Sequence, residues 1–133
     1  RRFVDIKFLK KIFSTNYVLK HLDENQFTEV PTLSGCFLCV RTSILKEING
    51  FDERFFLYME DVDLVRRVGM KYKTIFCPFI DVKHGFKKGS YRDLKLLILH
   101  IKSAILYFNK YGWIRDKYRL DKNKYAMKKI NNL

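Results

Sequence analysis

One stretch of the sequence decides the fold: Gly50-Phe51-Asp52-Glu53-Arg54-Phe55-Phe56-Leu57-Tyr58-Met59-Glu60-Asp61-Val62-Asp63-Leu64. Its first half is rich in aromatic side chains and predicts a loop over residues 51–58. Glu60 and Asp61 then predict a helix start, because acidic side chains favour the unpaired N–H groups and the dipole at a helix N-terminus. Gly69 is expected to end this helix. Its apolar positions are Val62, Leu64, Val65 and Val68.

The residues before this stretch predict a buried strand and a short helix. Cys36–Val40 is a continuous apolar run, which is typical of a strand covered on both faces. Thr42 is expected to cap a short helix that Gly50 ends in a left-handed conformation. Further upstream, apolar residues at helical spacing predict an amphipathic helix over residues 3–13, and residues 14–34 predict a loop.

The residues after the stretch predict one more strand and a long helix. Lys73–Cys77 is expected to form a strand ended by Pro78, and residues 81–88 a loop or short strand. Ser90-Tyr91-Arg92-Asp93 resembles a capping box, and the helix that follows is expected to end at Gly112. Its apolar stripe is Leu94, Leu97, Ile98, Ile101, Ile105 and Phe108. The tail beyond Trp113 is basic and is expected to fray after about Tyr125.

This order of elements predicts an α/β or α+β fragment with few strands. The chain has 133 residues, of which 47% are hydrophobic and 16% aromatic, so it fits one domain with a modest core and excludes a disordered tail. The net charge of +13 favours polyanionic partners: nucleic acid, acidic lipid headgroups or a phosphorylated substrate. Since acids are sparse in the basic C-terminal part, their crowding into residues 52–63 suggests a function there.

The three cysteines Cys36, Cys39 and Cys77 lie among apolar residues. They predict buried free thiols in a reducing compartment. A second pair of Cys or His residues at zinc spacing is missing, so a zinc site is not predicted.

The order and spacing of several short motifs resemble a known family. They are Gly35 and Arg41 around the predicted strand, G-F-D-E at residues 50–53, F-F-x-Y-x-E-D-x-D-L at residues 55–64, Arg66-Arg67, Pro78, His84, and Tyr107-Phe108-x-Lys110-Tyr111. The set resembles the C-terminal, acceptor-side portion of family-2 glycosyltransferases of the GT-A fold. The likeness is strongest to bacterial rhamnosyltransferase-like enzymes of surface-polysaccharide assembly.

The resemblance implies the C-terminal part of a Rossmann-like GT-A fold. Residues 1–133 would be a single glycosyltransferase portion, with its core at about residues 30–115 and a basic helical tail at residues 113–133. The nucleotide-binding half, with its D-x-D metal motif, would lie outside this chain. The chain alone is therefore expected to be inactive.

The resemblance also implies that Asp61 is the base of an inverting sugar transfer. A carboxylate within hydrogen-bond reach can take the proton of the acceptor hydroxyl as that oxygen attacks the anomeric carbon. Glu60 and Asp63 would then orient groups or tune the charge of the base. The alternative is that all three acids only begin a helix.

Other residues near the motif are candidates for substrate contact. Asp52 can bind the acceptor or can instead hydrogen-bond its own backbone in a turn. Phe55, Phe56 and Tyr58 can pack in the core, or can offer flat apolar faces to a sugar ring.

The basic residues and histidines leave similar alternatives. Arg66 and Arg67 can pair with the acids, bind a donor diphosphate or lie on a solvated helix face. His84 is the candidate contact to a metal or diphosphate, and the alternative is an ordinary loop histidine. His100 is expected to pack within the long helix.

The partners implied by the resemblance are a nucleotide-sugar donor such as dTDP-rhamnose and a saccharide or lipid-linked acceptor. A divalent metal, Mg²⁺ or Mn²⁺, would be bound mainly by the half outside this chain. A cytoplasmic location at the inner face of the cell membrane, membrane-surface contact of the basic tail and homo-oligomerisation are further expectations. The rival hypotheses are a basic nucleic-acid-binding domain and an oligomerisation or interaction module; both leave the Glu60-Asp61 motif unexplained.

Overall fold

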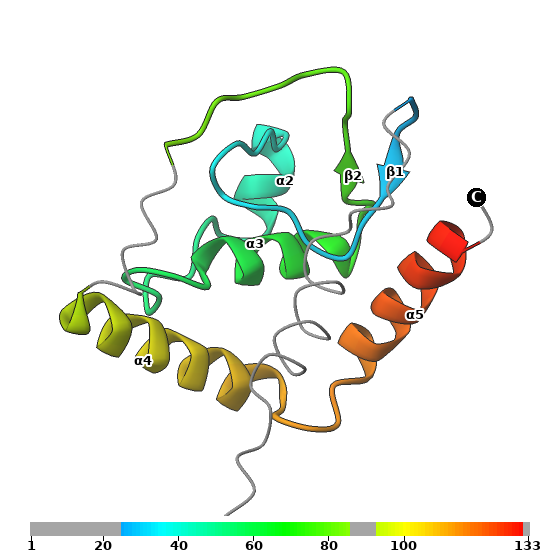
Figure 1. The fold of residues 1–133 in the computed structure, drawn as a ribbon. Helices are drawn as coiled ribbons and strands as arrows, with labels where there is room; N and C mark the ends of the chain where they lie inside the picture. The colour runs from blue at the N-terminus through cyan, green and yellow to red at the C-terminus, as the bar shows by residue number, and fades with distance from the viewer. Residues whose placement is uncertain (1–24, 86–92, 132–133) are drawn as a thin grey trace, which may run out of the picture.

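The computed structural model describes residues 25–85 and 93–131 (Figure 1). In chain order the elements are β1 Thr28–Glu29, α2 Thr42–Glu47, α3 Glu60–Gly69, β2 Ile75–Phe76, α4 Leu94–Tyr111 and α5 Lys117–Asn131. This mixture of helices with one small sheet agrees with the predicted α/β fragment. The helix predicted at residues 3–13 and the predicted cap residue Ser90 lie outside the described residues.

The sheet consists of two short antiparallel strands, β1 and β2. Thr28 pairs with Phe76, and Glu29 pairs with Ile75. The backbone N–H of Val30 donates to the carbonyl oxygen of Thr74 at 2.9 Å, which extends the pairing by one bond. The predicted strand at residues 73–77 is confirmed in shorter form, whereas the loop predicted at residues 14–34 is wrong at β1.

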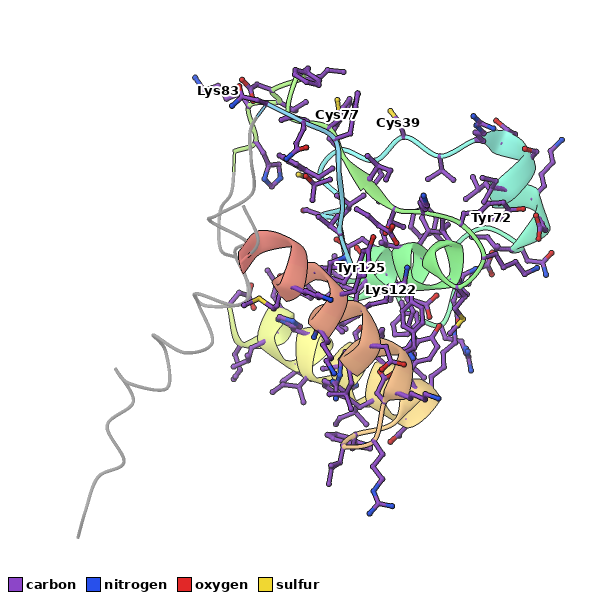
Figure 2. The ribbon with its side chains drawn as sticks, turned by 90° about the vertical axis from the view of Figure 1, so that its right-hand side faces the viewer. Cys39, Tyr72, Cys77, Lys83, Lys122 and Tyr125 are labelled. Atoms are coloured by element: carbon purple, nitrogen blue, oxygen red, sulfur yellow. The ribbon has the colours of Figure 1, made fainter. Side chains whose placement is uncertain are left out.

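The strand predicted at Cys36–Val40 is wrong. This segment is irregular, and Cys36 and Cys39 are exposed. A strand needs a hydrogen-bonded neighbour, and within the described residues the only pairing is between β1 and β2. All three cysteines are free, as predicted, but Cys77 is only half-buried, so the prediction of buried thiols is also wrong. Figure 2 shows the side chains of Cys39 and Cys77.

The short helix α2 begins differently from the prediction. Arg41, not Thr42, occupies the capping position, with extended backbone angles and no side-chain cap. Thr42 is already helical and therefore cannot act as the cap. At the other end the chain turns through Asn49 and Gly50 at φ of 58° and 62°, which confirms the left-handed conformation predicted for Gly50.

Helix α3 lies at the centre of the molecule, with α4 on one side and α2 and the sheet on the other (Figure 1). Leu64, Val65 and Val68 are buried, as their helical spacing predicts. The helix ends at Gly69, where Tyr118 of α5 packs closely. A Cβ at Gly69 would lie 2.3 Å from the Tyr118 hydroxyl oxygen, so this contact requires glycine.

Helix α4 ends as predicted, but Asp93 is its N-cap and not the N3 residue of a capping box begun by Ser90. The Asp93 side chain accepts hydrogen bonds from the N–H groups of Lys95 and Leu96 at 2.7 and 3.3 Å, and Gly112 follows the last turn. The buried residues of α4 are Ser103 and Tyr107. The predicted apolar stripe lies on the other side of the helix and is mostly exposed to solvent.

Helix α5 continues to Asn131, so the fraying expected after Tyr125 is wrong. Burial of one residue and an ion pair one turn earlier accompany this continuation. Ala126 is 4% exposed, and Lys122 forms a 2.9 Å ion pair with Glu29 of β1. The described helices are too short or too polar to span a lipid bilayer.

Candidate functional site

A strained turn carries the chain into α3. Tyr58 and Met59 both have left-handed backbone angles, with φ of 67° and 66°. Each such residue costs on the order of 1–3 kcal/mol, so the surrounding contacts must hold the turn in place. The turn places Glu60 and Asp61 in the first turn of α3, as the sequence predicts.

Helix α4 supplies two of those contacts. The hydroxyl of Ser103 donates to the carbonyl oxygen of Leu57 at 2.7 Å. The ring of His100 stacks on Tyr58 with the ring centroids 4.5 Å apart, which confirms the prediction that His100 packs. Ser103 has no signal in the sequence that would have indicated this role.

The carboxylate of Asp61 is oriented by two backbone N–H groups. Oδ2 accepts a 2.6 Å hydrogen bond from Gly35, and Oδ1 accepts a 2.8 Å hydrogen bond from Val62. The side chain is only half-buried. Because a carboxylate oxygen has more than one lone pair, each oxygen can still accept a proton or a further hydrogen bond.

Glu60, the neighbouring acid, has an unusual environment. Its Oε2 is buried and has no hydrogen-bond partner among the described residues. Burying a carboxylate oxygen without a partner is costly, and such groups often mark a site that a ligand completes. The two carboxylates therefore differ. Backbone N–H groups hold Asp61, whereas Oε2 of Glu60 accepts no hydrogen bond from the described residues.

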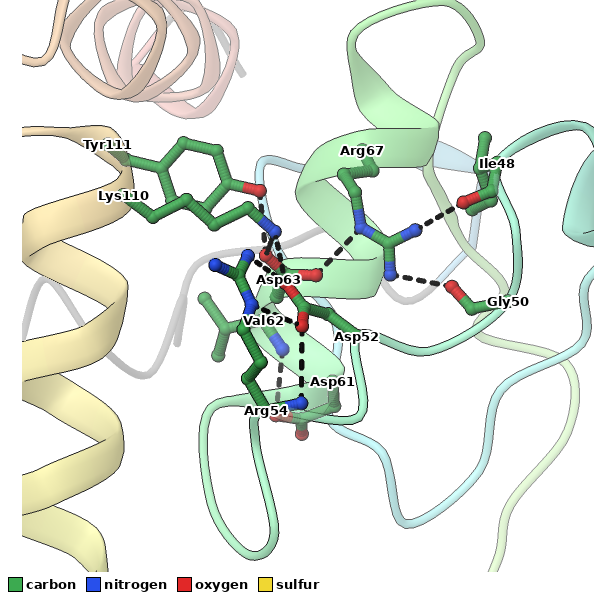
Figure 3. A network of polar contacts seen from close by, with 10 residues as sticks. All are labelled: Ile48, Gly50, Asp52, Arg54, Asp61, Val62, Asp63, Arg67, Lys110 and Tyr111. Atoms are coloured by element: carbon green, nitrogen blue, oxygen red, sulfur yellow. Dashed lines mark hydrogen bonds and ion pairs between the residues drawn. The ribbon is translucent and has the colours of Figure 1, made fainter.

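Asp63 is fully buried, and three side chains donate to it (Figure 3). Lys110 donates to its Oδ1 at 2.6 Å, Tyr111 to the same oxygen at 2.7 Å, and Arg67 to its Oδ2 at 2.7 Å. Burial alone would raise the pKa of Asp63, but these hydrogen bonds outweigh it and lower the pKa below its usual value. Asp63 therefore links α3 to the end of α4.

Asp52 joins the same network from the loop before α3. Its carboxylate accepts hydrogen bonds from Arg54 Nε and Nη2 at 2.8 and 2.6 Å, and from Lys110 at 2.7 Å. The Arg54 hydrogen bond is the largest cause of a pKa for Asp52 far below the usual range. Lys110 therefore bridges two carboxylates. The backbone N–H of Arg54 also donates to Asp52 at 3.2 Å, so the predicted turn and a tertiary contact occur together.

The two arginines of α3 both pair with acids. Arg67 bonds Asp63 and also donates to the carbonyl oxygens of Ile48 and Gly50 at 2.7 and 2.6 Å, which ties α3 to the end of α2. Arg66 is buried and makes a bidentate pair with Asp116.

Aromatic rings surround the buried Arg66. Its guanidinium carbon lies 3.8 Å from the ring centroid of Tyr111 and 4.9 Å from that of Tyr118. The hydroxyl of Tyr107 accepts a 3.3 Å hydrogen bond from Arg66. The described residues therefore show both arginines paired with acids, which was one of the three alternatives for them.

The aromatic residues of the loop separate into buried and exposed ones. Phe55 is 5% exposed, whereas Phe56 is 82% exposed and Tyr58 is half-buried on His100. Phe55 thus fits the packing alternative, and Phe56 has a ring face open to a ligand.

His84 lies in an exposed, irregular segment after β2. In residues 25–85 and 93–131, no group of three His, Cys, Asp or Glu side chains is arranged to hold a metal ion. The role of His84 as a metal or diphosphate contact therefore stays a prediction.

Sequence reasoning missed the contribution of the chain beyond residue 109. Lys110 and Tyr111 donate to Asp63, and Asp116 pairs with Arg66, so these residues hold two charged side chains of α3 in place. Lys110 and Tyr111 belong to the motif at the end of the long helix, which was the available signal, but the pattern assigned them no role.

Comparison with curated proteins identifies relatives of the chain. The N-acetylglucosaminyl-diphospho-decaprenol L-rhamnosyltransferase of Mycobacterium tuberculosis H37Rv is 35% identical over 111 residues, which is 80% of this chain and 36% of the relative. The protein of the same name from strain CDC 1551 matches equally well. The chain is rhamnosyltransferase-like. The rhamnosyltransferase WbbL of Escherichia coli K12 is 42% identical over 43 residues, 32% of this chain and 16% of the relative.

The rhamnosyltransferase-like chain thus spans little more than a third of the length of the mycobacterial relatives. No family model matches it, and no solved structure does.

Proposed function

We propose that the chain supplies the acceptor side and the catalytic base of an inverting family-2 glycosyltransferase of the GT-A fold. Asp61 carries the proposal. Its carboxylate lies at the start of α3 and is oriented by the N–H of Gly35. The similarity to rhamnosyltransferases supports sugar transfer as the reaction.

In this mechanism Asp61 takes the proton of an acceptor hydroxyl. The oxygen forms a bond to the anomeric carbon as the bond from that carbon to the nucleoside diphosphate breaks on the opposite face. The diphosphate leaves with the electron pair of the broken bond, so the anomeric configuration inverts. The two N–H groups that hold Asp61 fix the direction from which it receives the proton.

Glu60 has a separate part in the proposal. Its unpartnered Oε2 would accept a hydrogen bond from a second hydroxyl of the acceptor sugar and thereby orient it. Tyr58 and Phe56 precede Glu60 by two and four positions, and both carry aromatic faces suited to a sugar ring.

The buried charges of α3 have a positioning role in this proposal. Hydrogen bonds within the protein fix the orientation of α3. The carboxylates of Asp52 and Asp63 accept them, and the guanidinium groups of Arg66 and Arg67 donate them. Because both arginines are engaged by carboxylates, a donor diphosphate would draw its main contacts from elsewhere.

A divalent metal, Mg²⁺ or Mn²⁺, is part of the proposal for the full-length enzyme only. The described residues of this chain do not make a metal site by themselves. His84 would contribute one contact to that metal at most.

The donor is proposed to be a nucleotide sugar such as dTDP-rhamnose, and the acceptor a saccharide on a lipid carrier. The name of the mycobacterial relatives describes transfer of L-rhamnose to a diphospho-decaprenol-linked sugar. The proposed location is the inner face of the cell membrane, where surface-polysaccharide precursors are assembled. Residues 1–133 would form one portion of the enzyme and would be inactive alone.

The test is a transfer assay with the full-length protein that carries this chain. It would be incubated with dTDP-rhamnose and a lipid-linked N-acetylglucosamine acceptor, and NMR would report the anomeric configuration of the product. Inverted product from the full-length protein, and none from residues 1–133, is expected. Absence of transfer with a panel of nucleotide sugars, together with micromolar or tighter RNA or DNA binding that falls steeply with salt, would favour the nucleic-acid alternative.

A further inference from the structure

The exposed face of α4 is an apolar surface without a cover in the described structure. Its residues, which we call the α4 stripe, are Leu94, Leu97, Ile98, Ile101 and Ile105, and they are 71%, 40%, 45%, 50% and 44% exposed. They recur at helical spacing, so they lie along one side of the helix. A helix of 18 residues is about 27 Å long, and the stripe runs along most of it.

The apolar surface continues beyond the end of α4. Phe108 lies at the C-terminal end of the stripe, and the ring centroid of Trp113 is 5.1 Å from it. Trp113 is 54% exposed, and the next residue, Ile114, is 83% exposed. The indole N–H donates to Asn109 at 2.8 Å, so the ring has a fixed orientation at the surface.

The charges around the α4 stripe have one sign. Lys95 and Lys102 are exposed on α4, and Arg115 is exposed in the segment that follows. Helix α4 contains no Asp or Glu. The two acids nearest to it in sequence are engaged by protein groups: Asp93 caps the helix, and Asp116 is buried against Arg66.

We propose that the α4 stripe docks on an anionic lipid surface, with the helix lying parallel to the membrane plane. An apolar helix face bordered by lysines is the pattern of a helix at the membrane interface, where long basic side chains reach the headgroups. A terminal tryptophan is also favoured at that depth. The surface charge argues against a second copy as the occupant, since two stripes bordered by basic residues would repel.

This docking does not depend on sugar transfer, so it can be tested on residues 1–133 directly. Trp113 is the sole tryptophan of the chain, and its fluorescence therefore reports the surface at the C-terminal end of the stripe. We expect a blue shift on addition of phosphatidylcholine vesicles that contain phosphatidylglycerol, and quenching by brominated acyl chains. Pure phosphatidylcholine vesicles are expected to give a much weaker response.

Matched variants separate three contributions to vesicle binding: the apolar side chains of the stripe, the lysine charges, and non-specific adsorption of exposed apolar residues. Ile98→Ser/Ile101→Ser should reduce partitioning more than tenfold, because both side chains would lose their burial in lipid. Ile80→Ser/Val82→Ser removes apolar side chains that are 60% and 48% exposed elsewhere, and should leave partitioning unchanged. Lys95→Gln/Lys102→Gln should weaken binding to the anionic vesicles about tenfold or more.

Two results would overturn the proposal. One is vesicle binding by Ile98→Ser/Ile101→Ser that equals binding by the unaltered chain. The other is a dimer in lipid-free sedimentation that this same variant dissociates, which would make a second copy the occupant. Circular dichroism of each variant checks that the helices are retained.

Discussion

Oδ2 of Asp61 accepts a 2.6 Å hydrogen bond from the backbone N–H of Gly35, which lies 26 residues earlier in the chain. The contact joins an irregular, exposed loop to the first turn of α3. It fixes the direction of the carboxylate more firmly than the helix start alone could. The orientation of the proposed base therefore depends on a segment that carries no chemistry of its own.

Replacement of Gly35 by alanine should disturb this contact. A Cβ at Gly35 would lie 2.8 Å from the Cβ of Asp61, closer than such atoms approach, so the loop must shift. We expect a loss of about 1–3 kcal/mol in the free energy of unfolding, measured in urea, and lower turnover of the full-length enzyme.

Gly85→Ala is the matched control for this substitution. A Cβ at Gly85 would meet no heavy atom within 4 Å, so stability and turnover should stay unchanged. Equal effects of the two substitutions would show that the Gly35 contact has no special importance.

Asp63→Asn should make the chain less sensitive to acid. The pKa of Asp63 is lower in the folded than in the unfolded chain, so its ionised form stabilises the fold at neutral pH. That stabilisation is complete above the unfolded pKa of about 4 and is lost as the pH falls through the folded pKa. Asparagine does not titrate, so the variant has no such stabilisation to lose as the pH falls.

The measurement is the urea unfolding free energy as a function of pH. At neutral pH the Asn variant should be less stable by about 2 kcal/mol, as is typical of hydrogen bonds to a charged group. The difference from the unaltered chain should shrink below about pH 4. Exposed Asp81 supplies the control: Asp81→Asn should follow the unaltered curve. A constant difference at all pH values would contradict the prediction.

Asp116→Asn should be strongly destabilising. The side chains of Arg66 and Asp116 are 6% and 1% exposed, so the substitution leaves a guanidinium buried without its counter-charge. The expected loss is about 3–5 kcal/mol in the free energy of unfolding. Asp121→Asn, at an exposed position in the same part of the chain, should cost little. A loss below about 1 kcal/mol would mean that the pair behaves as a surface ion pair.

Local signals were enough to predict the helices around the site. The acids at Glu60 and Asp61 mark where α3 begins, and Gly69 and Gly112 mark where α3 and α4 end. These features depend on a few neighbouring residues, which a sequence displays directly.

Contacts between residues far apart in the sequence could not be predicted from such local signals. The apolar run at Cys36–Val40 has the composition of a strand, but composition does not supply the neighbour that a strand needs. Likewise, Asp63 and Lys110 are separated by 47 positions, and no local pattern indicates that their side chains meet. The resemblance was enough to name Asp61 as the candidate base, whereas only the structure shows that Gly35 donates a hydrogen bond to it.

The most direct test of the account is the turnover of the full-length enzyme with Asp61→Asn. Asparagine keeps the shape of the side chain, and its single oxygen can still accept from Gly35 although it then loses the bond from Val62. The loop contact should therefore remain while the base is lost. We expect turnover to fall by about 10²- to 10⁴-fold, as for loss of a general base, with donor affinity nearly unchanged. Near-normal turnover would contradict the assignment of Asp61 as the catalytic base.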